Sequence, residues 1–421
     1  MGVPPHAEGE ENPSSLGNTQ NELNLFWTHL YWKDGLHIDG KYKNFKFRIG
    51  GIIMLDMGNL NAGSKINHTF PHFEDKNGNL RKLILELNGV LFDTVETKFQ
   101  IDFANINEIK DNWFRFLNVP ILKRFKFGHM KEPFSLEALT SGSDLTFMER
   151  ALPVMAFSSS RNIGIRYDDL GREGELTWAV GAFLNTGSFS NIGTASDQIK
   201  QRSGWDITGR ITYHINIEKK ERDFFHFGVS YTHRFLDRGK DENEIKFSSL
   251  PESYLTNTRL LDTGKFSLKH LDAIDGEFAY VSGPFSIQSE IFNVFLNSET
   301  KGRPHFWGGY VYGSYFLTGE TRPYDKTHGI FSNVKPIHPF RPFVGQWGAF
   351  EVALRVSYAD LNGSGIRGGR ERNLSAGLNW YLFPQTRVMF NYIYADLLES
   401  DAPRVRNGHA DILMLRLQFG F

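Results

Sequence analysis

The sequence ends with DILMLRLQFGF, Asp411 to Phe421, a stretch that alternates strictly between two kinds of side chain. One set is wholly apolar, namely Leu413, Leu415, Leu417, Phe419 and Phe421. The other set is mixed, namely Ile412, Met414, Arg416, Gln418 and Gly420. Alternation with a period of two predicts a β-strand. A strand that finishes the chain on a bare aromatic residue calls for an explanation, which the rest of the sequence supplies.

The same alternation recurs along the chain in at least four further stretches. They are KFRIGGIIMLD (46–56), WDITGRITYHINIE (205–218), FFHFGVSYTHRF (224–235) and FEVALRVSY (350–358). In each stretch one face is apolar with aromatic residues near its ends, and the other is polar, charged or small. Ile52 and Met54 interrupt the polar face of the first. A membrane barrel requires this arrangement, with lipid outside, a polar lumen inside and aromatic girdles at the two interfaces.

We therefore predict an all-β fold, a closed antiparallel transmembrane β-barrel of about sixteen strands spanning residues 35–421. The sheet must close because open edges are not tolerated in lipid. A barrel closes by pairing its last strand with its first, and the alternating strand that ends on Phe421 resembles the C-terminal recognition signal of outer-membrane barrels. Residues 1–34 are largely polar and contain proline, and we interpret them as a flexible tail.

The composition excludes several other classes of protein. The 421 residues carry 47 basic and 48 acidic side chains, which gives no indication of a nucleic-acid partner. Cysteine is absent, so disulfides, zinc–thiolate sites and cysteine nucleophiles are excluded. The longest uncharged stretch, Leu176 to Ser196, becomes polar in its second half, so no membrane-spanning helix is expected. The first twenty residues lack the basic start and apolar core of a signal peptide.

The connections between the predicted strands fall into two length classes. VSGP (281–284) and FPQT (383–386) are tight turns, whereas the segments 236–258 and 319–345 are long and polar. Outer-membrane barrels have short turns at one end and long loops at the other. We therefore expect the two long segments to lie at the end opposite the two tight turns.

One long connection, residues 131–160, is unusually apolar; we call it the constriction loop. Most loops have about 4–6 residues, whereas this one has about thirty and carries Leu136, Leu139, Leu145, Phe147, Met148, Leu152, Met155 and Phe157. Such a loop should pack against other parts of the protein, and we predict that it folds into the barrel lumen and narrows the channel. An extracellular cap or a contact between subunits is the alternative.

Several stretches resemble the phosphate-selective porin O and P family. The segment KFGHMKEPFSLEALTSGSDLTFMERALPVMAFSSSRNIGIRY (126–167) carries the matching residues Lys131, Pro133, Phe134, Glu149, Arg150, Arg161, Asn162 and Gly164. Further matching segments are Gly308–Asp325, Gly345–Asn362 and Gly377–Pro384. The resemblance runs from about residue 35 to the end of the chain. It implies a sixteen-stranded homotrimeric porin in the lipid of the bacterial outer membrane. Its function would be passive diffusion of small hydrophilic solutes, with a preference for phosphate or other anions.

Passage of anions requires Lys and Arg side chains that face the lumen. The candidates on lumen-facing positions are Lys46, Arg48, Lys126, Lys131, Arg161, Arg166, Arg210, Arg234, Arg355 and Arg416. With Arg150, Lys131 and Arg161 are expected to set the charge preference. Each candidate could instead be an ordinary lumen residue paired with a carboxylate. The family's dense arginine ladder is missing from the mid-barrel strands, and the loop carries Glu132, Glu137, Asp144 and Glu149, so a less selective pore is an equal expectation.

Two other functional classes remain as alternatives: a lipase-like barrel enzyme and a soluble β-rich binding protein. The enzyme would need a Ser/His pair at the outer rim, and the sequence has no Gly-x-Ser-x-Gly motif. We predict no catalytic residues, no cofactor and no metal site. Pro71 breaks any helical pairing of His68 with His72, and EDKNGN (74–79) lacks the closing glutamate of an EF-hand loop.

Overall fold

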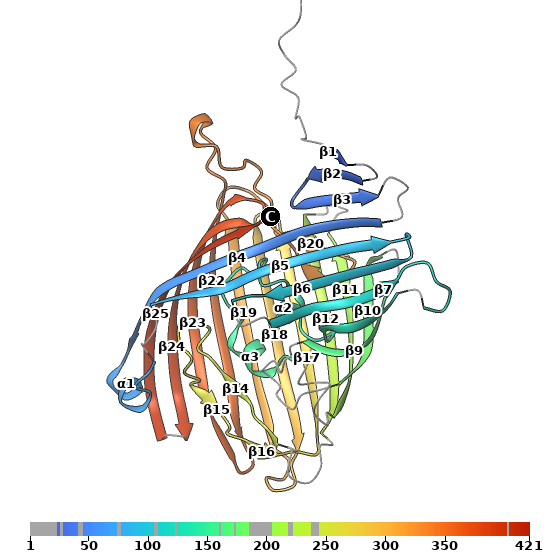
Figure 1. The fold of residues 1–421 in the computed structure, drawn as a ribbon. Coiled ribbons are helices and arrows are strands. Elements are labelled where there is room, and N and C mark those ends of the chain that lie inside the picture. Colours follow the sequence, from blue (N-terminus) through green and yellow to red (C-terminus); the bar gives the residue numbers. More distant parts are fainter. Residues whose placement is uncertain are drawn as a thin grey trace, which may run out of the picture.

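Sixteen antiparallel strands close into a barrel in the computed structural model (Figure 1). The structure describes residues 23–25, 28–40, 45–73, 77–104, 108–122, 124–159, 161–171, 174–184, 204–217, 222–236, 244–401 and 404–421. The ring closes where the last strand pairs with the first barrel strand, with Ala410 opposite Ala62 and Gly420 opposite Ile52. The predicted fold class and strand number are confirmed.

The ring strands, in order, are β4 (Phe45–Ala62), β5 (Gly78–Leu91), β6 (Val95–Asp102), β7 (Glu108–Phe116), β8 (Phe125–Lys131), β9 (Arg161–Gly171), β10 (Leu176–Leu184), β11 (Trp205–Asn216), β12 (Asp223–Phe235), β17 (His270–Ser282), β18 (Phe285–Asn297), β19 (His305–Phe316), β22 (Ala349–Gly363), β23 (Ile366–Phe383), β24 (Thr386–Asp401) and β25 (Arg404–Gly420). Short strand pairs in the connections are β13 (Glu244–Ile245) with β16 (Phe266–Ser267), β14 (Ser248–Ser249) with β15 (Leu261–Asp262), and β20 (Tyr324–Asp325) with β21 (Ile330–Phe331). The helical segments are α1 (Ser64–Thr69), α2 (Leu136–Leu139), α3 (Leu152–Phe157) and the 3-10 turn η2 (Pro342–Val344).

The terminal aromatic residue completes the seam of the barrel. The backbone N–H of Phe421 donates to the carbonyl of Gly51, and the N–H of Gly51 donates back to the carbonyl of Phe421, both at 3.0 Å. A Cβ atom at Gly51 would lie 2.8 Å from the Phe421 ring, so only glycine leaves room for the ring there. The ring of Trp32 stacks on Phe421 with centroids 6.1 Å apart. The backbone of the last residue is therefore part of the closing ladder, and its ring packs over the seam.

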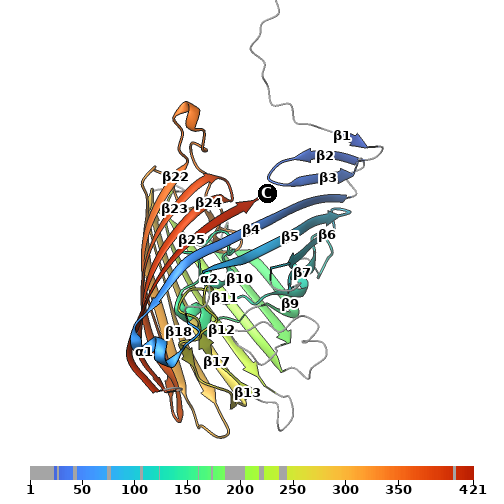
Figure 2. The same cartoon turned by 60° about the vertical axis from the view of Figure 1, so that its left-hand side comes forward.

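Three short strands extend the sheet beyond the C-terminus: β1 (Leu23–Leu25), β2 (Thr28–Trp32) and β3 (Leu36–Gly40). β3 pairs with Lys46–Ile49 of β4, past the point where β25 ends, as Figure 2 shows. The sheet thus begins earlier than the predicted tail over 1–34 allows, while residues 1–22, 26 and 27 lie outside the described residues. The overlooked signal is the Asp34–Gly35 pair, which takes positive φ in the β2–β3 turn.

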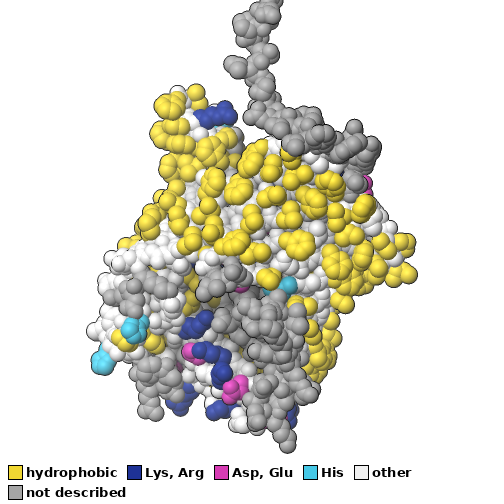
Figure 3. All heavy atoms as spheres, in the orientation of Figure 1, with side chains coloured by type: hydrophobic (Ala, Val, Ile, Leu, Met, Phe, Trp, Pro, Cys, Tyr) yellow, Lys and Arg dark blue, Asp and Glu magenta, His cyan; other side chains and the backbone are white. Residues whose placement is uncertain are grey.

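The apolar and polar faces of the strands lie as the alternation predicts. On β25, Leu413, Leu417 and Phe419 are exposed on the outside, whereas Arg416 and Gln418 are buried inside. The same division holds on β22, where Val352, Leu354 and Val356 are exposed. Figure 3 shows hydrophobic side chains gathered in a broad band across the upper half of one face. Among the described residues, no helix is long and apolar enough to cross a membrane.

The prediction for the ends of the barrel is wrong for one long connection. Residues 317–348 join β19 to β22 at the same end as the tight turns after β17 and β23, and this end also carries the C-terminus (Figure 1). The physical reason is that part of the segment does not protrude: Glu320, Arg322, Phe331 and Val334 are buried. Length and polarity cannot indicate which end a segment occupies when it folds back into the lumen.

Candidate functional site

The constriction loop lies inside the barrel. Six of its eight apolar side chains predicted to pack are buried, namely Leu136, Leu145, Phe147, Met148, Leu152 and Phe157, whereas Leu139 and Met155 are partly buried and line the cavity. The ring of Phe147 meets that of Tyr312 on β19 edge-on at 5.7 Å, and Phe157 lies against Phe292 on β18 at 6.2 Å. These contacts with inward-facing wall residues exclude the extracellular cap and the subunit contact for this part of the loop.

Arg416 attaches the constriction loop to the seam of the barrel. Its guanidinium donates to both carboxylate oxygens of Asp56 on β4, at 2.6 and 2.7 Å. It also donates to the Glu149 carboxylate at 2.6 Å and to the backbone carbonyl of Met148. Arg81 on β5 holds the same Glu149 through two hydrogen bonds of 2.7 and 3.0 Å. The loop is thus attached to β25 through Arg416 and to β5 through Arg81, and these two strands flank β4.

Arg355 and Arg234 have the same kind of role. Arg355 on β22 donates to Glu252 at 2.5 Å and to the carbonyl of Glu149 at 3.0 Å, and its guanidinium lies 4.2 Å from the centre of the Phe147 ring. Arg234 on β12 pairs with Asp206 at 2.6 Å and with Glu132 of the loop at 3.3 Å. Both side chains are completely buried. They were predicted as pore residues, but the structure places them behind the loop.

The β19–β22 connection enters the lumen from the other end and is held by Arg210. The Arg210 guanidinium makes a bidentate ion pair with Glu277 on β17, with both bonds at 2.7 Å. It also donates to the carbonyls of His328 and Gly329, at 3.1 and 2.8 Å. Arg210 is therefore a fourth predicted pore residue whose contacts are structural.

The open part of the lumen is a cavity of about 940 Å³ between the β4–β9 wall and the constriction loop. Among the described residues, twelve Lys and Arg and eight Asp and Glu line it, a surplus of four positive charges. The basic residues are Arg48, Arg81, Lys82, Lys98, Lys110, Arg115, Lys126, Lys131, Arg150, Arg161, Arg166 and Arg259. The acidic residues are Glu86, Glu96, Glu108, Asp111, Glu132, Asp144, Glu149 and Asp325.

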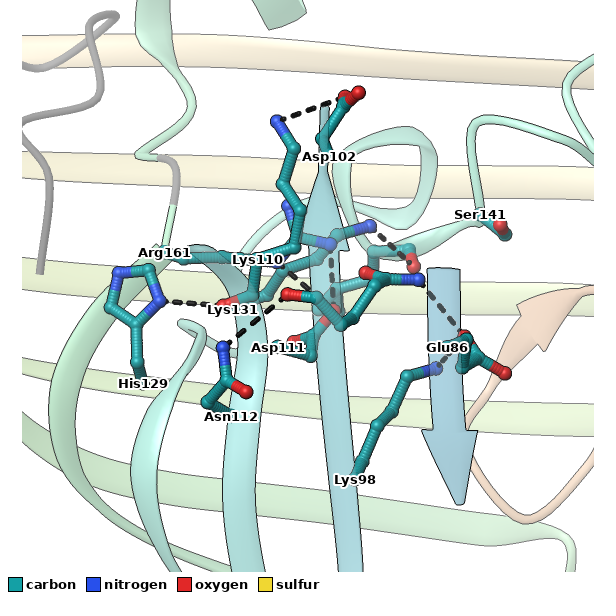
Figure 4. Close-up of polar contacts among 12 residues, drawn as sticks. Glu86, Lys98, Asp102, Lys110, Asp111, Asn112, His129, Lys131, Ser141 and Arg161 are labelled. Carbon is teal, nitrogen blue, oxygen red and sulfur yellow. Dashed lines mark hydrogen bonds and ion pairs between the residues drawn. The ribbon is translucent and has the colours of Figure 1, made fainter. Parts of the chain in front are cut away.

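Many of these cations on the wall are paired with carboxylates. Figure 4 shows one group, in which Arg161 on β9 reaches Asp111 on β7 at 2.7 Å and Lys98 on β6 reaches Glu86 on β5 at 2.8 Å. Likewise, Arg166 pairs with Asp168 at 2.5 Å. Such pairs add little net charge to the pore.

Four other cations, Lys82, Lys131, Arg150 and Arg259, face the cavity without a carboxylate partner within ion-pair distance among the described residues, and the first three lie together at the constriction loop. We call Lys82, Lys131 and Arg150 the constriction cations. The Lys131 ammonium donates to the carbonyls of Ala138, Leu139 and Thr140, at 2.6, 3.0 and 3.2 Å. Arg150 donates to the carbonyls of Glu137, Ala138 and Thr140. Together they satisfy the carbonyls at the end of α2, which no helical turn follows.

Lys82 is the least constrained of the constriction cations. It extends from β5 across the cavity to Gly142 in the loop, where a Cβ atom would lie 2.2 Å from its ammonium nitrogen. Glycine at 142 is therefore what permits this approach. No hydrogen bond or ion pair joins the Lys82 side chain to any other described residue, while Arg150, Lys131 and Glu149 are charged neighbours at longer range. The loop tip and the wall thus meet at a lysine side chain that has no carboxylate within ion-pair distance among the described residues.

Three of the four acidic residues of the constriction loop do not offset this charge, whereas the fourth, Asp144, lines the cavity. Glu149 is held by two arginines, and Glu132 accepts hydrogen bonds from Asn162, Thr208 and Arg234. Burial alone would raise the pKa of the Glu149 carboxyl, but Arg81 and Arg416 beside it hold that pKa low, at about 2. Glu137 is buried beside Arg355 and is not part of the cavity wall. The acidic residues of the loop, which in the sequence argued against an anion pathway, therefore argue against it only weakly.

The structure divides the predicted site residues into two groups. Arg48, Lys126, Lys131, Arg150, Arg161 and Arg166 line the cavity, whereas Arg210, Arg234, Arg355 and Arg416 do not. Lys46 lies half exposed near Asp93, away from the cavity.

Sequence reasoning missed the basic residues of the first barrel strands, namely Arg81, Lys82, Lys98, Lys110 and Arg115, together with Arg259. A signal was available in the segment after Arg81. Lys82, Ile84, Glu86 and Asn88 alternate there with Leu83, Leu85 and Leu87.

The comparisons with known proteins agree with this architecture. The family model for phosphate-selective porin O and P matches residues 47–421. Porin O of Pseudomonas aeruginosa is 24% identical over 440 residues, covering 92% of this chain and 91% of that protein. Among solved structures, the anion-selective porin from Comamonas acidovorans has a TM-score of 0.52 at 13% identity, over 90% of this chain and 100% of that one. The outer-membrane channel DcaP of Acinetobacter baumannii has a TM-score of 0.52 at 12% identity, over 90% and 99%.

The family match covers most of the chain, and the two solved structures share its fold. A closed barrel with an apolar exterior also excludes the soluble binding protein that the sequence left open. Family and fold are those of a channel rather than an enzyme. The chain belongs to the phosphate-selective porin O and P family and is a β-barrel porin of the bacterial outer membrane, through which solutes pass by passive diffusion.

Proposed function

We propose that this porin favours small hydrophilic anions, phosphate among them, over cations. The observation that carries the proposal is the group of constriction cations, Lys82, Lys131 and Arg150, which face the cavity with no carboxylate paired to them among the described residues. Ammonium and guanidinium groups replace part of the hydration that an anion loses in a narrow pore. The surplus of four positive charges around the cavity acts in the same direction.

The relatives support this preference without fixing the solute. The matching family is named for phosphate selectivity, and one solved structure with this fold is described as an anion-selective porin. Phosphate is a small oxyanion that accepts hydrogen bonds on every oxygen, so it suits the Lys82 ammonium and the remaining N–H groups of the Arg150 guanidinium. Lys131, whose three N–H groups donate to loop carbonyls, contributes its charge. Chloride would be attracted by the same positive charges but would accept fewer hydrogen bonds from them.

Replacing Lys82 with Glu should lower the permeability of anions relative to cations. In a confined pore one charge acts at a dielectric below that of water, so the shift in ion preference should be on the order of 1 kcal/mol. The measurement is the reversal potential in a planar bilayer across a KCl gradient, repeated with potassium phosphate. The shift should shrink as salt is raised, because at ~0.15 M ions screen a charge within about 8 Å.

Lys265→Glu is the matched control, because Lys265 lies 72% exposed beside Glu244 in the β12–β17 connection. Lys131 itself is unsuitable for charge reversal, since a carboxylate there would face three carbonyl oxygens and would disturb α2. Equal reversal potentials for the Lys82 and Lys265 variants at low salt would refute the proposed selectivity site.

We further propose that the protein assembles as a homotrimer, with the wall of short strands facing its partners. β6, β7 and β8 have only eight, nine and seven residues, whereas β23–β25 have 18, 16 and 17. A strand needs about 9–11 residues to span the hydrocarbon layer, so this wall is the one that gains most from a neighbouring barrel. Its outer side exposes Phe99 and Phe114. Light scattering of the detergent-solubilised protein should give the mass of three chains; the mass of one chain would contradict the proposal.

A further inference from the structure

Three carboxylates that the pore does not use gather on the inner side of one hairpin. Asp275 and Glu277 lie on β17 and Glu290 on β18, and each offers an oxygen within 4.8 Å of the others. Glu277 and Glu290 are directly opposite each other in the strand register. All three side chains are buried. Like charges directly opposite each other destabilise a sheet, so this arrangement needs a compensating partner.

The protein compensates only part of this charge. Glu277 is neutralised by the bidentate Arg210 and is touched by His226 at 3.1 Å. Glu290 accepts hydrogen bonds from the Tyr310 hydroxyl at 2.5 Å and from the amides of Leu136 and Glu137 at 2.6 and 3.1 Å. Among the described residues, no cation lies within ion-pair distance of Glu290 or Asp275, so these two carboxyl groups have no cationic partner there.

Asp275 provides an independent observation that points to a ligand. Its Oδ2 atom accepts one hydrogen bond, from the Ser230 hydroxyl at 3.1 Å. Its Oδ1 atom is buried and has no hydrogen-bond partner among the described residues, and the side chain is completely shielded from solvent. A buried carboxylate oxygen without a partner is costly, and an oxygen in this position is free to coordinate an ion.

We propose that Asp275, Glu277 and Glu290 bind one divalent cation of the hard, oxygen-seeking kind, with Ca²⁺ as the best match. Carboxylate oxygens are the ligands that Ca²⁺ prefers, and it tolerates irregular coordination by six to eight oxygens. A charge of two balances the two carboxylates that Arg210 leaves uncompensated. The sequence gives no motif for this site, because the ligands come from two strands of a hairpin and resemble ordinary lumen residues.

The position of the site indicates what the ion would do. Glu290 holds the first two amides of α2, and the Ser230 hydroxyl that donates to Asp275 accepts from the amide of Ser135 at 3.2 Å. The carboxylate cluster is therefore the support on which the first turn of the constriction loop rests. A bound ion would fix these carboxylates and, through them, α2. This role does not depend on which solutes cross the pore.

Calcium titration calorimetry on the whole barrel tests the site. The protein should be refolded from inclusion bodies into detergent, so that no lipopolysaccharide contributes calcium sites, and stripped of metal with a chelator that is then removed. We expect one Ca²⁺ to bind per chain. Asp275→Asn should weaken this binding at least tenfold. Asp272→Asn should leave it unchanged, because Asp272 lies on the same strand but contacts Tyr231 and His233 outside the cluster.

Terbium luminescence gives a second measurement that does not require a ligand variant. Tb³⁺ bound at the site should be sensitised by Tyr310, and Tyr310→Phe should lower the emission without removing the Ca²⁺ stoichiometry. Absence of stoichiometric Ca²⁺ binding in the unmodified protein overturns the proposal, as does an unchanged affinity in Asp275→Asn. A melting temperature that rises in Asp275→Asn with no Ca²⁺ bound to either protein would show that the carboxylates share a proton instead.

Discussion

An arginine in place of Leu354 is expected to block assembly of the barrel in the outer membrane. Leu354 lies near the middle of β22 on the outer face and is 63% exposed, the surface that lipid covers. Arginine at the bilayer midplane costs about 2–4 kcal/mol on the lipid face of a barrel. Folded barrels migrate differently before and after heating on a gel, so the heat-modifiable fraction in outer-membrane preparations measures the effect.

An arginine introduced on the lumen side is the control. Asn88 on β5 lines the cavity, so Asn88→Arg should assemble normally. Ser357, although it points inward, is not a fair comparison, because it is buried and donates to Glu252. Equal assembly of the Leu354 and Asn88 variants would contradict the orientation of the strands in the membrane.

The orientation of the strands could be predicted from sequence because lipid imposes a local rule. Each outward residue must be apolar whatever its distant partners are. Nine consecutive residues of β22, or eleven of β25, are therefore enough to show which side chains face the lipid. The constriction loop could be predicted for a related reason. A connection with eight large apolar residues has to be buried somewhere, and the lumen is the nearest place.

The division of the arginines could not be predicted, because it depends on contacts that are far apart in sequence. Arg416 and Asp56 are separated by 360 positions, and Arg355 and Glu252 by 103. In the strand pattern, Arg355 and Lys82 both appear as a cation on an inward position. Only the path of the constriction loop decides that Arg355 lies behind it and Lys82 in front. The β19–β22 connection was misplaced for a similar reason, since its burial depends on Arg210 in a distant strand.

Replacing Arg416 with Met should release part of the constriction loop and destabilise the barrel. The side chain is 1% exposed and bridges Asp56 to Glu149. Removing one member of a buried ion pair leaves the other charge uncompensated and costs about 3–5 kcal/mol. Glu149 keeps Arg81 as a partner, whereas Asp56 loses its bidentate bond. We expect a lower melting temperature, a larger single-channel conductance and more current noise, because the loop narrows the lumen from inside.

Arg372→Met separates the effect of the loop from that of losing any arginine. Arg372 pairs with Asp396 at 2.7 Å, but its side chain is 58% exposed, and surface ion pairs contribute only about 0–1 kcal/mol. That variant should therefore match the unmodified channel in conductance and closely in stability. In Arg416→Met, adding Glu149→Gln should restore little, because the unpaired charge belongs to Asp56. If Arg416→Met conducts like Arg372→Met, the loop is held without its bond to the seam, and the aromatic contacts of Phe147 and Phe157 are sufficient to keep it in the lumen.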